Sequence, residues 1–160
     1  MPDMLVKLYE LPELDPVLRE QAVNDITIRR ALTPEKHFVV DWVGEKFSQF
    51  WKSECETAFA HQPVSCFIAT EKDSLIGFGC YDTTRKGFFG PTGVSESVRG
   101  RGIGKALLLV CLHSMWWEGY GYAIIGGVGP AAFYAKTVGA TMIEGSVPGI
   151  YKGLLRKSDG

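Results

Sequence analysis

The chain has 160 residues and a net charge of −1, with 46% apolar and 22% charged residues. This size and balance are those of one globular domain with a single core. The small net charge gives no field that would recruit nucleic acid or an anionic membrane, so we expect neither as a partner. No secretion signal is visible after Met1, and the longest apolar run, residues 106–112, is too short to span a bilayer, so we expect a cytoplasmic protein.

The first 60 residues carry signals for short strands and two aromatic-rich helices. We interpret residues 1–25 as an N-terminal extension to a core that begins at about residue 26. Thr33 followed by Pro34 predicts a helix start with threonine as the N-cap. The expected elements are a strand at 4–9, a helix at 13–23, a strand at 26–28, a helix from 33 and a second helix that ends before residue 63.

The remaining residues predict a hairpin followed by alternating helices and strands. The strand at 88–94 contains Gly90, Pro91 and Gly93, which suit a bulge or a place where something other than a strand approaches the backbone. The other expected elements are strands at 65–70 and 75–81, an apolar helix at 104–118, a strand at 123–125, a helix at 131–138, and a last strand at 141–143 with a partner around 150–154. This order predicts an α+β (mixed α/β) fold, with a mixed sheet and helices on both faces.

The most informative segment is residues 94–105, where a strand leads through three alternate glycines into the apolar helix. Glycine has no Cβ, so successive backbone N–H groups can converge on one ligand, and the helix N-terminus adds unpaired donors and a positive dipole. Cationic side chains stand beside the glycines: Arg99, Arg101 and Lys105. The pattern indicates a phosphate site, best suited to a pyrophosphate. A P-loop would need glycine in place of Arg99, and a Rossmann fingerprint would need glycine in place of Lys105, so both are excluded.

Two segments resemble motifs of the GNAT N-acetyltransferase superfamily. Arg99-x-x-Gly102-x-Gly104, between a strand and a long apolar helix, is similar to its motif A, and residues 129–140, with Phe133-Tyr134-Ala135-Lys136, are similar to its motif B. The two occur in the expected order and spacing, and the resemblance covers about residues 26–143. It implies a splayed, mostly antiparallel sheet in which the strands at 88–94 and 123–127 separate at one end.

The resemblance also implies acetyl-CoA as the cosubstrate, with its pantetheine arm in the gap and no metal. The residues carried over for its binding are Thr92, Gly93 and Val94 toward pantetheine, and Arg99, Gly100, Arg101, Gly102, Ile103, Gly104 and Lys105 toward the pyrophosphate. Tyr134 matches the tyrosine that commonly gives a proton to the departing thiolate. The implied activity is acyl transfer from acetyl-CoA to a small-molecule amine or an exposed amino group. The alternative is a non-catalytic acyl-CoA-binding sensor or interaction module.

The chain departs from the family at the general base, because the strand at 123–127 carries no acid where many members have a glutamate. The open candidates for the base are Glu54, Glu56, Glu96, His61 and His113, or else the amine enters already deprotonated. The helices at about 34–60 usually wall the acceptor side, so Trp51 and Glu54 are the candidate acceptor residues, with Tyr151 as an alternative. Phe50 and Trp51 lie where the two helices meet, so we expect at least one of them to line either a pocket or a homodimer interface.

The four cysteines are not arranged as a metal site in the sequence. Cys55, Cys66, Cys80 and Cys111 form no C-x-x-C pair and stand near no histidine at ligand spacing. We expect them to be buried, reduced thiols.

Overall fold

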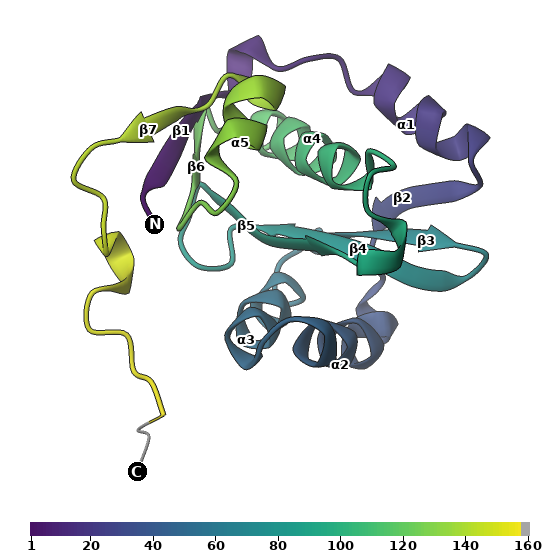
Figure 1. Cartoon of the computed structure of the whole chain (residues 1–160). Coiled ribbons are helices and arrows are strands. Elements are labelled where there is room, and N and C mark those ends of the chain that lie inside the picture. The colour runs from purple at the N-terminus through teal and green to yellow at the C-terminus, as the bar shows by residue number, and fades with distance from the viewer. Residues whose placement is uncertain (158–160) are drawn as a thin grey trace.

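The computed structural model of the chain describes residues 1–157, which form one seven-stranded sheet between two layers of helices (Figure 1). The strand order is β2-β3-β4-β5-β6-β1-β7, and every neighbouring pair is antiparallel except β5 and β6. The mixed, mostly antiparallel sheet with helices on both faces confirms the predicted fold class.

The elements have the following bounds. The strands are β1 (Asp3–Lys7), β2 (Ile26–Arg30), β3 (Cys66–Glu71), β4 (Ser74–Tyr81), β5 (Phe88–Val94), β6 (Tyr122–Ile125) and β7 (Thr141–Ile143). The α-helices are α1 (Asp15–Val23), α2 (Lys36–Lys46), α3 (Gln49–Ala58), α4 (Ile103–Trp117) and α5 (Ala131–Val138). The 3-10 turns are η1 (Leu8–Glu10), η2 (Thr33–Glu35), η3 (Glu96–Val98) and η4 (Gly149–Tyr151).

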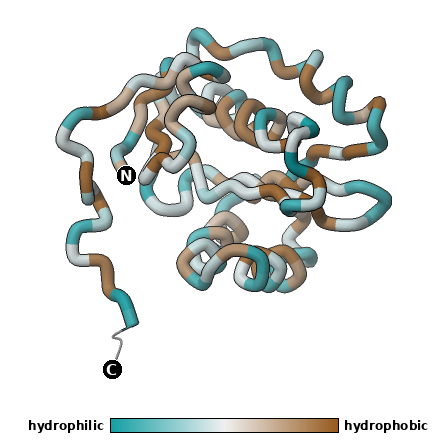
Figure 2. Tube along the Cα trace, viewed as in Figure 1, coloured by the Kyte–Doolittle hydropathy of each residue, from teal (hydrophilic) through white to brown (hydrophobic). Residues whose placement is uncertain are grey.

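Each face of the sheet has its own apolar core. α2 and α3 pack on one face against β3 and β4, and α4 lies on the opposite face with α1 and α5 around it (Figure 1). Figure 2 shows α4 as apolar over most of its length, which fits a helix enclosed by the sheet and its neighbours. None of the helices within residues 1–157 combines the length and apolar composition that crossing a membrane requires.

The N-terminal strand lies inside the sheet. β1 pairs antiparallel with β6 on one side and with β7 on the other, and Met4 is opposite both Ile125 and Met142. Residues 1–25, which we interpreted as an extension, therefore supply one internal strand, and α1 packs against α4. Because β1 pairs with β7, the strand expected around 150–154 is not formed; that prediction is wrong, and the segment contains η4 followed by irregular chain.

The start of the first aromatic-rich helix also differs from expectation. The 3-10 turn η2 precedes α2, and the Leu32 N–H donates to Glu35 Oε1 at 2.6 Å, so Glu35 rather than Thr33 provides the side-chain cap. The same carboxylate pairs with the Arg29 guanidinium at 2.7 Å, which lowers the pKa of Glu35 to about 2.

Candidate active site

β5 and β6 separate just after they begin to pair. Their parallel ladder contains only Phe88 opposite Ile124 and Phe89 opposite Ile125, where β6 ends. β5 continues to Val94 and stays paired with β4 on its other edge. Between Pro91 and Val94, no strand of the described chain flanks the β6-facing edge of β5. The splayed sheet predicted from the sequence is thus present, and its gap leaves backbone groups of β5 free.

A cleft of about 690 Å³ occupies this gap. It brings together four predicted site regions: residues 92–94 of β5, Gly104 at the start of α4, Tyr134 of α5, and Trp51 with Glu54 of α3. The other lining residues that sequence reasoning had not assigned to the site include Thr84, Phe88, Phe133 and Arg156. Most of the wall is apolar, so the few polar groups that face the cleft can orient a ligand.

Gly93 is required by packing as well as by the cleft. A Cβ at this position would lie 2.5 Å from Cζ of Phe47, so a side chain there would displace that ring. Phe47 in turn packs against Trp51, with ring centroids 5.1 Å apart. The neighbouring Thr92 hydroxyl donates to the Phe78 carbonyl at 3.0 Å. The Thr92 side chain is therefore held by β4, and the missing side chain of Gly93 leaves room for the Phe47 ring.

The glycine loop at the end of the cleft presents a run of free donors. Gly100 and Gly102 have φ of +85° and +77°, the left-handed region that favours glycine. Within residues 1–157, no acceptor pairs with the backbone N–H groups of residues 100–105; the first helical bond there runs from the Ala106 N–H to the Gly102 carbonyl. Six consecutive unpaired N–H groups at a helix N-terminus suit an anionic ligand.

The cations of this loop differ in their surroundings. Arg101 pairs with Glu71 of β3 at 3.0 Å, and its carbonyl accepts from Gln21 Nε2 of α1 at 2.9 Å, so contacts from two other elements fix the loop. Arg99 lies 3.9 Å from Glu96, and Lys105 is exposed. Of residues 99–105, only Gly104 lines the cleft itself, which places the loop at its end rather than along its wall.

Tyr134 is held in the cleft wall by burial. Its residue is 7% exposed, and its ring packs edge-to-face against Phe133 with centroids 5.1 Å apart. Burial alone raises the pKa of the Tyr134 phenol to about 12, without a hydrogen-bond contribution from a neighbouring group. The hydroxyl is therefore protonated at neutral pH and free to donate to a ligand.

Comparison with known proteins agrees with this geometry. The profile described as Acetyltransferase (GNAT) family matches residues 33–139. The chain belongs to the GNAT acetyltransferase family. The family is one of acyltransferases, and the matched range includes the glycine loop at 99–104 and Tyr134. Among curated proteins, none matches the chain.

Solved GNAT structures share the fold at low identity. The GCN5-related glucosamine N-acetyltransferase region of a fungal multi-domain GH3 beta-N-acetylglucosaminidase superimposes with a TM-score of 0.72 at 14% identity, over 89% of this chain and 19% of that chain. GNAT proteins of Sphaerobacter thermophilus and Kribbella flavida each give a TM-score of 0.61, at 20% and 14% identity, over 89% and 88% of this chain and 48% and 53% of theirs. The chain thus spans about half or less of the length of these proteins.

Among the five side chains left open as the GNAT general base, only Glu54 lines the cleft. Glu56 lies 3.6 Å from Lys36 on the outer side of α3, and the side chain of Glu96 is 88% exposed. His61 Nε2 is 3.0 Å from the Asp82 carbonyl, and His113 Nε2 is 2.7 Å from the Pro12 carbonyl. Burial could not be seen in the sequence, which is why these five were not separated there.

Three of the cysteines are closer together than their sequence spacing indicated. Cys55 of α3, Cys66 of β3 and Cys80 of β4 are buried, and their sulfur atoms all lie within 4.8 Å of one another. Hydrogen bonding with Cys55 raises the pKa of the Cys66 thiol, and burial raises the pKa of the Cys80 thiol, which favours the protonated form at both. Hydrogen bonds with Cys66 and Cys80 lower the pKa of Cys55 to about 5, so the thiolate that metals bind is favoured at one sulfur of the three. These three thiols lie in the core on the α2–α3 face and do not line the cleft.

Proposed function

We propose that this GNAT protein transfers the acetyl group of acetyl-CoA to an amine. The observation that carries the proposal is the cleft between β5 and β6, which connects a loop of free N–H groups at one end with Tyr134 and Glu54. The four cysteines are all free thiols, which accords with the cytoplasmic location expected from the sequence.

Coenzyme A fits the donors that line this path. The unpaired edge of β5 at residues 92–94 offers backbone groups to an amide-containing chain such as pantetheine. The N–H groups of residues 100–105 suit a pyrophosphate, because glycine leaves them accessible and the α4 dipole favours an anion. When bound, coenzyme A would supply an acyl group activated as a thioester.

The remaining chemistry is assigned to side chains of the cleft. A neutral amine attacks the thioester carbonyl, so a C–N bond forms and the C–S bond breaks, giving an amide and a free thiol. The Tyr134 hydroxyl donates its proton toward the departing sulfur. The proton lost by the amine passes to Glu54 or to solvent, since β6 carries no acid.

The competing function is acyl-CoA binding without catalysis, which the absence of an acid on β6 favours. Thiol release separates the two, because only a transferase consumes acetyl-CoA in the presence of its acceptor. We would assay thiol release with a panel of amines that includes glucosamine, the acceptor named for one structural relative. Release that depends on one class of amine supports transfer. Tight acetyl-CoA binding with no release from any amine supports the binding module.

A further inference from the structure

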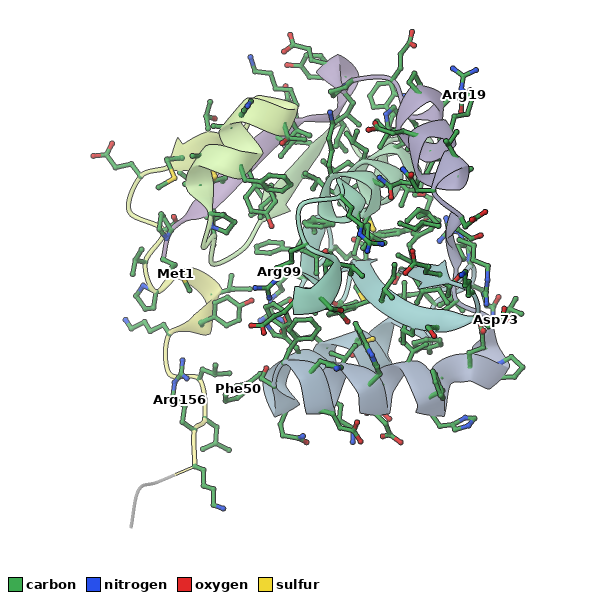
Figure 3. All side chains as sticks on the ribbon, turned by 45° about the vertical axis from the view of Figure 1, so that its right-hand side comes forward. Met1, Arg19, Phe50, Asp73, Arg99 and Arg156 are labelled. Atoms are coloured by element: carbon green, nitrogen blue, oxygen red, sulfur yellow. The ribbon has the colours of Figure 1, made fainter. Side chains whose placement is uncertain are left out.

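The mouth of the cleft is formed by α3 and the C-terminal segment. Phe50, Trp51 and Glu54 share one face of α3, because residues three and four apart on a helix are neighbours. Thr84 from the β4–β5 connection and Tyr151 of η4 complete the wall. In Figure 3 the C-terminal segment passes beside the start of α3, and Arg156 lies next to Phe50.

Glu54 is a carboxylate without a cationic partner. The Thr84 hydroxyl donates to Glu54 Oε2, and no Lys, Arg or His among residues 1–157 forms an ion pair with it. Burial raises the pKa of Glu54 above its ordinary value, since its partly apolar surroundings disfavour the charged form. A half-buried carboxylate in a ligand cleft, with no internal counter-ion, is suited to a ligand that brings the positive charge.

The groups around Glu54 are those that bind an alkylammonium. Phe50, Trp51 and Tyr151 are aromatic residues that line the same cleft. Aromatic faces attract organic cations, and a carboxylate adds a charge-assisted hydrogen bond. We propose that this mouth is the acceptor subsite, that Glu54 is the counter-ion of the incoming ammonium group, and that the acceptor is a monoamine with an apolar body. The inference rests on the proposed acyl transfer and names its substrate class.

The second charged side chain at the mouth, Arg156, disfavours an acceptor that carries more than one ammonium group. Arg156 holds its guanidinium 5.6 Å from the Phe50 ring centroid, and its side chain lines the same cleft. A diamine or a basic peptide bound at Glu54 would bring a second cation into the cleft that this guanidinium lines, and like charges repel. The mouth therefore favours a monoamine over a polyamine.

The test is direct binding to the coenzyme A-saturated protein at pH 7, by calorimetry, with two ligands of similar shape. Benzylamine carries the ammonium group, and benzyl alcohol lacks the charge. We expect wild type to prefer benzylamine by about 10- to 100-fold, the effect of one hydrogen bond to a charged group. In Glu54→Gln the preference should fall to about one, because Gln keeps an acceptor for Thr84 but has no charge.

A second readout separates this role from simple packing. Removing an unpaired, partly buried charge should stabilise the unliganded fold, so we expect Glu54→Gln to raise Tm by about 2–4 °C. The matched control is Glu56→Gln, two residues along α3 on the exposed side, which should leave both the ligand preference and Tm unchanged.

A separate comparison tests the role of the Arg156 charge. Wild type should bind butylamine more tightly than 1,4-diaminobutane, and Arg156→Gln should narrow that difference in affinity.

The outcomes distinguish the two proposals. Equal binding of benzylamine and benzyl alcohol by wild type, or a benzylamine preference that survives in Glu54→Gln, would overturn the acceptor subsite. A Tm that falls in Glu54→Gln would also overturn it, because the carboxylate would then be a stabilising structural group. If Glu54-dependent amine binding is found but no amine releases thiol from acetyl-CoA, the mouth is an amine-binding site, and both the transferase activity and the acceptor role of that site are refuted.

Discussion

At Tyr134 the ring is buried, and within residues 1–157 the hydroxyl has no hydrogen-bond partner to lose. Tyr134→Phe should therefore leave Tm and coenzyme A affinity unchanged while kcat falls by roughly 10²-fold, the usual contribution of one general acid. Thiol release measures kcat, and calorimetry measures coenzyme A affinity. The control is Tyr9→Phe on the exposed turn η1, which should retain wild-type kcat.

The raised pKa of Tyr134 also limits how the pH dependence of kcat can be interpreted. Because the phenol is protonated up to about pH 12, its ionisation cannot produce the alkaline limb of a rate profile measured below about pH 10. A wild-type kcat in Tyr134→Phe would assign the ring to packing and leave water as the acid.

The glycine loop is best tested at Gly104 rather than at Gly102. Gly102 has a φ of +77°, and a Cβ there would lie 3.2 Å from Gln21 Nε2, so a side chain would strain the backbone as well as the ligand site. A Cβ at Gly104 would meet only Val94, at 3.9 Å, and Gly104 lines the cleft. Gly104→Val should keep Tm and lower coenzyme A affinity by about 10-fold or more, the loss of one charge-assisted contact.

A glycine outside the cleft provides the comparison for that variant. Gly121, in the α4–β6 connection, has open space around its Cβ position, so Gly121→Val should leave coenzyme A affinity intact. Calorimetric titration of both variants gives the answer. Unchanged affinity in a folded Gly104→Val protein would move the pyrophosphate away from the start of α4.

A site residue could be predicted from the sequence only where the residues that define its role are its neighbours in the chain. The loop glycines and Tyr134 lie in contiguous motifs, so the sequence alone located them. Glu54 was one of five equal candidates, because its burial depends on Thr84 and on the C-terminal segment, both distant in sequence. Arg156 gave no signal at all, since its position beside Phe50 follows only from the path of the chain after β7.

At the scale of elements, the N-terminal strand β1 holds the β6–α5 connection, which lines the cleft. The Asp3 carboxylate of β1 accepts a hydrogen bond from the Gly127 N–H at 2.9 Å. The backbone N–H of Asp3 donates to Ser146 Oγ at 2.8 Å. Gly127 lies in the β6–α5 connection that lines the cleft. Asp3→Ala should cost about 1–3 kcal/mol of unfolding free energy, because the Gly127 N–H loses its acceptor.

Asp3→Asn separates hydrogen bonding from charge, since the amide oxygen can still accept from Gly127. We expect it to recover most of the lost stability in urea unfolding. Hydrogen exchange at residues 126–130 should be faster in Asp3→Ala than in Asp3→Asn. Equal exchange in the two variants would show that the carboxylate does not hold this connection.

Most elements were predictable because their signals are local. The helices at 104–118 and 131–138 and the strands at 65–70, 75–81 and 88–94 agree with the structure to within two residues at each end. The irregular residues of β5 also marked the edge from which β6 departs. The place of β1 could not be read, because residues 3–7 find their partners more than 100 residues away, at 122–125 and 141–143.

At the scale of the whole molecule, that long-range pairing frees the end of the chain to form part of the cleft. With β1 between β6 and β7, the residues after β7 add no strand to the sheet within the described chain. They line the cleft instead, and Figure 1 shows them descending on the left to the level of α3. The acceptor side that we propose is therefore built from the two parts of the sequence with the least recognisable motifs. The homodimer considered from the sequence stays a prediction, checked by light scattering.

The last prediction concerns metal and ligand stability together. The three clustered thiols are the one group of possible metal ligands found among residues 1–157, and no histidine or carboxylate joins them. A metal bound by all three sulfurs would require thiolates at Cys66 and Cys80, whose pKa values are raised well above the ordinary value, so we expect purified protein to contain no stoichiometric metal. Coenzyme A at 100 times its Kd should stabilise the fold by about 2.7 kcal/mol, equally with and without EDTA, as followed by thermal unfolding. Elemental analysis of the purified protein measures the metal content independently. One equivalent of zinc or copper whose removal lowers Tm would contradict the expectation and make the Cys55–Cys66–Cys80 cluster a structural thiolate site, on the opposite face of the sheet from α4.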